Sequence, residues 1–137
     1  MKIRISADEP IVFFVRVKGP KGVREFRAVL DTGSTDSLIP LQDARELGYD
    51  AYYDDFSKTG EATRGITKTD IIEADEIVLE EVAVADLVAR DVKALAYDMS
   101  RFTGIEAVLG ISFLRNFNTY INFEQGYLTI QPISPSP

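Results

Sequence analysis

Two runs of strand-type residues lie near the start of the chain, the first mostly apolar and the second alternating, and a turn-forming stretch separates them. Residues 11–17 are rich in β-branched and aromatic side chains, and apolar residues occupy every second position from Phe26 to Leu30. The intervening residues 18–22 contain two glycines and a proline, which favour a turn. This pattern predicts a β-hairpin whose second strand ends directly at Asp31.

A short helix is predicted at residues 40–47. Pro40 suits the first turn of a helix, because the backbone N–H at that position has no partner in the helix, and Gly48 is a typical C-terminal stop. The next stretch, residues 54–69, is polar and contains Gly60 and Gly65, as expected for a loop or hairpin between strands. Two further extended segments are expected, at 71–79 and at 82–97.

The last part of the chain begins with an apolar strand over residues 105–109. Gly110 follows, and apolar residues at helical spacing come next, so we expect a short helix that includes residues 113–117. A final hairpin is predicted from the β-type runs at 119–123 and 127–130, because turn-forming residues join them. Beyond it the chain is too rich in proline to hold a central strand.

Composition and charge narrow the possible partners. A length of 137 residues with 45% hydrophobic composition fits one domain, which we place at residues 1–131, with a flexible proline-rich tail at 132–137. The basic residues are scattered and the net charge is −7, so nucleic acid is not an expected partner. Charges interrupt the first nine residues, and no apolar run approaches the ~20 residues of a membrane span. We expect no membrane partner and a cytoplasmic location.

The chain contains neither cysteine nor histidine. Disulfides, thiolate nucleophiles, Ser-His and Cys-His nucleophile systems and histidine metal sites are therefore excluded from a single-chain mechanism. Acidic pairs occur at 54–55, 75–76 and 80–81, but their scatter is typical of a solvated surface rather than a metal site. We expect no metal and no cofactor. Any catalysis must use carboxylates, hydroxyls, lysines or tyrosines.

Two motifs suggest that a carboxylate is the catalytic group and indicate which one. The segment Val29-Leu30-Asp31-Thr32-Gly33-Ser34 places an acidic residue at a strand end, where Gly33 permits a turn. Taken alone, Asp-Thr-Gly is an ordinary turn sequence, since Asp and Gly are favoured in turns. Some eighty residues downstream, however, Val108-Leu109-Gly110 precedes a predicted helix. Together these motifs resemble those of the retropepsin-like aspartic peptidases, the single-domain relatives of pepsin, and the resemblance covers most of the chain.

The resemblance implies a mostly β fold, namely a closed β-barrel-like acid-protease (retropepsin) fold with one or two short helices, assembled as a homodimer. It implies that Asp31 is catalytic and that Val108, Leu109 and Gly110 have a structural place beside the catalytic loop. It also implies a flexible hairpin, the flap, which covers the substrate near residues 58–68. The flap residues would include Ala62, Thr63, Arg64, Gly65 and Ile66. A plain solvated loop is the other interpretation of this polar stretch.

A homodimer follows from the chemistry that the resemblance implies. Hydrolysis by this route needs one carboxylate to take a proton from water and one carboxylic acid to donate a proton to the scissile carbonyl. The chain carries one such motif, so water would be activated between two Asp31 side chains, one from each subunit. Thr32 would reach across the dimer axis, Gly33 would direct its N–H at the carboxylate, and Ser34 would hydrogen-bond the carboxylate from outside.

Other functions remain open at this level. The main prediction is an aspartic endopeptidase that acts on a peptide or unfolded-protein substrate. The alternative is a dimer of the same fold that binds peptides or supports assembly with little turnover, because a fold does not establish an activity. A third reading is a β-barrel binding domain unrelated to pepsin. The proline-rich tail is a poor match for a C-terminal interface strand, so the way in which the dimer is sealed is not predicted.

Overall fold

The predicted N-terminal hairpin supplies two adjacent strands of a closed barrel. The computed structural model describes residues 1–51, 63–64, 71–72, 74–98 and 104–133. Within them, β2 (Val12–Gly19) pairs antiparallel with β3 (Gly22–Leu30). Alternate β2 side chains are buried, so one face of the hairpin packs on a core and the other meets solvent.

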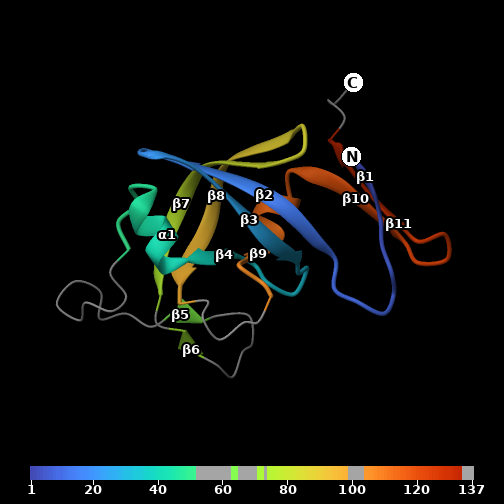
Figure 1. Ribbon diagram of the computed structural model, residues 1–137, viewed down its shortest axis with the longest axis horizontal. Helices are drawn as coiled ribbons and strands as arrows, with labels where there is room; N and C mark the ends of the chain where they lie inside the picture. Colours follow the sequence, from blue (N-terminus) through green and yellow to red (C-terminus); the bar gives the residue numbers. More distant parts are fainter. Residues whose placement is uncertain (52–62, 65–70, 73, 99–103, 134–137) are drawn as a thin grey trace.

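Six strands close into a barrel in the order β2-β3-β9-β4-β8-β7 (Figure 1). The other four are β4 (Ser37–Pro40), β7 (Asp75–Val84), β8 (Leu87–Tyr97) and β9 (Ala107–Leu109). Short β9 lies between β3, which it meets in parallel, and β4, which it meets antiparallel. The segment between β3 and β4 therefore has both of its ends held against one strand. The mostly β fold with a closed barrel is confirmed.

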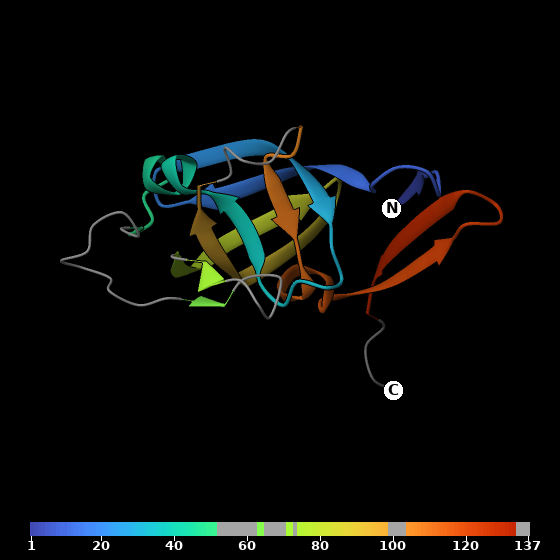
Figure 2. The same ribbon diagram turned by 90° about the horizontal axis from the view of Figure 1, so that it is seen from below.

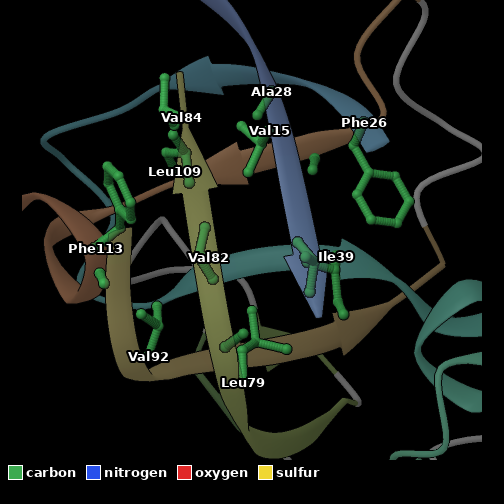
Figure 3. Packing of buried hydrophobic residues seen from close by; sticks show 14 of the residues in the cluster. Val15, Phe26, Ala28, Ile39, Leu79, Val82, Val84, Val92, Leu109 and Phe113 are labelled. Atoms are coloured by element: carbon green, nitrogen blue, oxygen red, sulfur yellow. The ribbon is translucent and has the colours of Figure 1, made fainter. Parts of the chain in front are cut away.

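Apolar side chains from all of these strands fill the barrel. Figure 3 shows residues such as Ile39, Val82 and Leu109 meeting inside it. Phe113 does not belong to a barrel strand, but its side chain joins this core and is fully buried. Its ring packs in a tilted arrangement on that of Phe117, with ring centroids 5.1 Å apart. Burial of this apolar surface is the main stabilising contribution to the fold.

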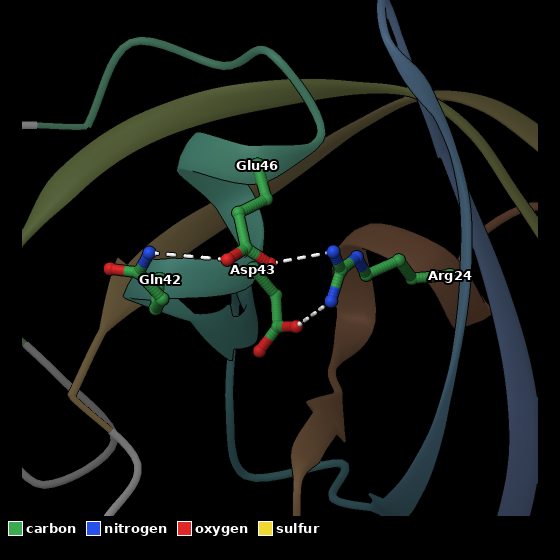
Figure 4. A network of polar contacts seen from close by, with 4 residues as sticks. All are labelled: Arg24, Gln42, Asp43 and Glu46. Atoms are coloured by element: carbon green, nitrogen blue, oxygen red, sulfur yellow. Dashed lines mark hydrogen bonds and ion pairs between the residues drawn. The ribbon is translucent and has the colours of Figure 1, made fainter.

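Two short helices accompany the barrel, as predicted. Helix α1 (Leu41–Glu46) follows Pro40 and stops at Gly48, whose positive φ of 96° favours glycine. Figure 4 shows Arg24 of β3 forming ion pairs with two carboxylates of α1, at 2.9 Å to Asp43 and 2.6 Å to Glu46. Helix α2 (Ile111–Leu114) begins directly after Gly110. It is shorter than predicted, because the chain already returns to extended structure at Phe117.

A second sheet stands to one side of the barrel (Figure 2). It has the order β1-β11-β10 and contains β1 (Lys2–Arg4), β10 (Phe117–Asn122) and β11 (Tyr127–Pro132). The predicted C-terminal hairpin is thus confirmed, and β1 adds to its free edge. The last strand extends into the expected tail by one residue, Pro132, which pairs with Phe117 at the end of the ladder.

Two sequence expectations about strands were wrong. The chain turns at Ala85-Asp86, so residues 82–84 belong to β7 rather than to the strand expected at 82–97. Ala85 occupies a left-handed conformation with φ 54°, where glycine or asparagine would have signalled the turn. Strand β4 was not expected, because its four residues are too few to show a period.

Candidate active site

Asp31 lies directly after β3, at the start of the loop that leads to β4. Its backbone N–H donates to the carbonyl oxygen of Leu109 (2.9 Å), and its own carbonyl oxygen accepts from Ser34 N–H (3.2 Å). The Gly33 N–H donates to Asp31 Oδ1 at 2.8 Å, as the sequence analysis expected of Gly33. The carboxylate is partly exposed. Local backbone bonds therefore fix where it points while it remains accessible.

The segment after β9 runs along the Asp31 loop at close range. A side chain on Gly110 would not fit, because its Cβ would lie 2.5 Å from the carbonyl oxygens of both Ser34 and Asp36. The N–H of Ile111 donates to Ser34 O (2.8 Å), and the N–H of Ser112 donates to Thr35 O (2.9 Å). The loop that carries Asp31 is thus held along its length, with Val108 and Leu109 buried beside it.

The expected role of Ser34 was wrong. Its hydroxyl donates to the carbonyl oxygen of Asp36 at 2.5 Å, and its side chain is 3% exposed. A serine hydroxyl has one proton, so this bond uses the donor that was expected to serve the Asp31 carboxylate. Thr32 is exposed on the loop, and its contact across a dimer axis stays a prediction.

The predicted flap falls mostly outside the described residues. Ala62, Gly65 and Ile66 lie there, whereas Thr63–Arg64 form β5, which pairs antiparallel with β6 (Ile71–Ile72). A short ladder at this position agrees with a hairpin, one of the two structures that the polar stretch predicted. Its role in substrate binding stays a prediction.

A second carboxylate, that of Asp36, lies at the far end of the loop. It lines a cleft of about 390 Å³ together with Lys93 and residues of α2, and Asp31 is not among the lining residues. Burial raises the pKa of Asp36 above its ordinary value, the negative charge of Glu76 raises it further, and the positive charge of Lys93 opposes both. Asp36 is therefore less readily ionised than a free aspartate.

Two serines that the sequence analysis did not single out also belong to this site. Ser37 is 2% exposed, and its hydroxyl is within 3.0 Å of the Ser112 hydroxyl. Single serines 75 positions apart gave no sequence signal, because their meeting depends on β9 lying beside β4. Within the described ranges, acidic side chains do not gather into a group that could hold a metal ion.

One comparison with known proteins identifies a family, and a second identifies a similar fold. A family model described as aspartyl protease matches residues 15–113. A solved structure described as a retropepsin-like aspartic protease from Rickettsia conorii is similar, with a TM-score of 0.64 and 22% sequence identity over 95% of this chain and 88% of that chain. At this identity the structural likeness establishes the fold alone. Comparison with curated proteins found no match. In the described part of the chain, neither helix is long and apolar enough to cross a membrane.

Proposed function

Because the chain belongs to the aspartyl protease family and is retropepsin-like, we propose that it is a homodimeric aspartic endopeptidase with Asp31 as its catalytic residue. The observation that carries the proposal is the setting of Asp31. Its Oδ1 accepts the Gly33 N–H, while its second carboxylate oxygen has no donor among the described residues. That oxygen is free to meet water and a second carboxyl group.

The proposed mechanism uses two copies of this carboxyl group. Two carboxyls held close together do not both ionise, so the pair shares one proton and titrates in two separate steps. The ionised Asp31 takes a proton from water as the water attacks the scissile carbonyl carbon. The protonated Asp31 of the other copy donates its proton to the carbonyl oxygen. Collapse of the tetrahedral intermediate breaks the C–N bond. The Asp31 that took the water proton gives it to the leaving nitrogen, and the other Asp31 takes a proton back from a hydroxyl of the intermediate, which restores the pair with one shared proton.

A substrate for this site would be an extended peptide or an unfolded protein segment. Such a chain can bind as an added strand, in which main-chain hydrogen bonds supply affinity and side-chain pockets supply preference. The hairpin that contains β5 and β6 is the proposed cover for the bound peptide. Thr32, exposed at the tip of the loop, is the proposed contact between the two subunits.

The test compares the wild-type protein with Asp31→Asn. The amide keeps the oxygen that accepts the Gly33 N–H, so the loop geometry should survive while the acid–base group is lost. We expect an unfolded protein to be cleaved between about pH 3 and pH 7, sensitivity to a transition-state-type aspartic peptidase inhibitor, and a loss of at least about 100-fold in the variant. Solution mass should correspond to a dimer.

Two outcomes would contradict the proposal. Cleavage that Asp31→Asn retains in full would mean that another group acts or that a contaminant cleaves. A well-folded dimer that cleaves nothing over this pH range would favour the peptide-binding or assembly module instead.

A further inference from the structure

Ser37 and Ser34 are the two buried polar or charged residues in the part of the chain that the structure describes. The Ser34 hydroxyl donates within the loop, whereas Ser37 links two segments of the chain. The Ser37 hydroxyl accepts the buried N–H of Gly110 at 3.1 Å, and the Ser37 backbone N–H donates to Ser112 Oγ at 3.0 Å. The two hydroxyls are also hydrogen-bonded to each other at 3.0 Å.

The direction of the bond between the hydroxyls follows from counting donors. Each serine has one hydroxyl proton. If Ser112 donated to Ser37, the proton of buried Ser37 would have no acceptor, which is costly inside a protein. If Ser37 donates, Ser112 accepts both the hydroxyl and the backbone N–H of Ser37. Ser112 is only half-buried and can direct its own proton to water. The second arrangement satisfies every group.

These bonds tie the end of the Asp31 loop to the segment that supports its beginning. Ser37 is the first residue of β4, where the loop ends. Gly110 follows Leu109, whose carbonyl oxygen accepts the N–H of Asp31. If the Ser37 hydroxyl were lost, the buried Gly110 N–H would be left without its acceptor, and the segment would shift to regain one. Loss of the Ser112 hydroxyl would act through Ser37, because the Ser37 hydroxyl and the Ser37 backbone N–H would both lose their acceptor. A shift at Gly110 moves Leu109 O and, with it, Asp31.

We propose that Ser37 and Ser112 form a hydroxyl pair that positions the Asp31 carboxylate for catalysis. The inference rests on the proposed peptidase function. Neither serine touches the carboxylate, so both are positioning residues. Misplacement of a catalytic group by about 1 Å can lower a rate by about 100-fold, which is why a remote pair of hydroxyls can matter for turnover.

The test is kinetic, in the whole 137-residue chain. Ser112→Ala removes the hydroxyl at the half-buried position, and Ser112→Thr retains it. We expect kcat to fall about 10- to 100-fold in Ser112→Ala with KM within about twofold of wild type, and Ser112→Thr to recover most of kcat. Ser37→Ala and the double variant complete a cycle. If the two hydroxyls act as a unit, the double variant should lose little more than either single variant.

Tyr49→Phe is the matched control. The Tyr49 hydroxyl also joins two segments, because it donates to Lys18 O (2.6 Å) and accepts from Glu80 N–H (2.8 Å), but it contacts neither the loop nor its support. This variant should shift the urea unfolding midpoint and leave kcat unchanged. Rates are compared after correction for the folded fraction, so a variant that is merely less stable does not imitate a positioning defect.

The outcomes separate the two proposals. If the wild type cleaves, Asp31→Asn does not, and Ser112→Ala retains wild-type kcat, the hydroxyl pair is overturned and the peptidase stands. Equal loss in Ser112→Ala and Ser112→Thr, or an equal loss in Tyr49→Phe, also overturns the pair, because the effect would then be general destabilisation. A wild type that does not cleave overturns both the peptidase and the positioning role.

Discussion

Gly110→Ala should distort the Asp31 loop through steric contact alone. The backbone at Gly110 has φ −99° and ψ −166°, an extended conformation open to alanine, so no conformational penalty accompanies the change. The added Cβ would instead lie 2.5 Å from the carbonyl oxygens of Ser34 and Asp36. A comfortable carbon–oxygen contact is about 3.3 Å, so these oxygens must move by about 0.8 Å.

That movement sets the expected loss of stability. The bond from Ile111 N–H to Ser34 O is 2.8 Å long and would stretch beyond hydrogen-bond range. Overpacking costs about 1–3 kcal/mol, and each lost bond adds about 1 kcal/mol. Alanine returns at most about 1 kcal/mol by restricting the unfolded chain. We expect a net loss of about 1–4 kcal/mol, which leaves a domain of ordinary stability folded.

Urea unfolding followed by far-UV circular dichroism measures this loss, and peptide cleavage measures its effect on the site. With a slope of about 1.5 kcal/mol per molar, the midpoint should fall by about 0.7–2.7 M. Gly19→Ala is the matched control, because its Cβ would also meet a backbone oxygen at 2.5 Å, that of Leu47, near α1. Gly19→Ala should lose stability but keep cleavage in its folded fraction. A midpoint for Gly110→Ala within about 0.3 M of wild type would refute the steric argument.

Three further substitutions test other parts of the structure. Phe113→Ala empties a fully buried position against Phe117 and should cost about 3–5 kcal/mol in urea unfolding, and a loss below about 1 kcal/mol would contradict its place in the core. Arg24→Ala removes ion pairs to α1 in which all three side chains are at least 27% exposed, so we expect less than about 1 kcal/mol, vanishing in high salt. The pKa of Asp36 is raised in the folded state, so the folded protein loses stability as Asp36 ionises with rising pH. Asp36→Asn removes this ionisation, so it should raise Tm at pH 7 and have no such effect below the ordinary pKa of 3.8. A gain in Tm that is equal at both pH values would refute the electrostatic cause.

Local patterns in the sequence were sufficient for the elements that form from neighbouring residues. Two strand-type runs around a turn-forming stretch predicted the β2–β3 hairpin, and Pro40 and Gly48 predicted the approximate limits of α1. The closure of the barrel was beyond such patterns. Strand β9 has three residues and joins β3 to β4 by pairing with segments about 70–80 residues away, which no local period encodes.

The same difference between local and long-range contacts applies to the candidate site. Asp31 and Gly33 could be placed from the motif, because the bond between them spans two residues. The hydrogen-bond partner of Ser34 could not be predicted, because its hydroxyl can donate either to the carboxylate or to the Asp36 carbonyl oxygen. The path of the loop determines which of the two it reaches. The contact between Ser37 and Ser112 needs the complete barrel. The sequence predicts the proposed catalytic carboxylate, whereas the tertiary structure determines the contacts that support it.

Contacts among the described residues of one chain already orient Asp31. The Leu109 carbonyl oxygen accepts the Asp31 N–H, and the Gly33 N–H donates to one Asp31 carboxylate oxygen. The segment at Gly110 packs closely against the loop. Loop ordering therefore accompanies folding of the subunit, and association need not order the loop again. If two subunits meet as proposed, each contributes a carboxylate that is already oriented, and the dimer interface has only to set the distance between them. Variants that weaken association should then lower activity in proportion to the dimer lost, while variants at Gly110 should lower activity within the dimer itself.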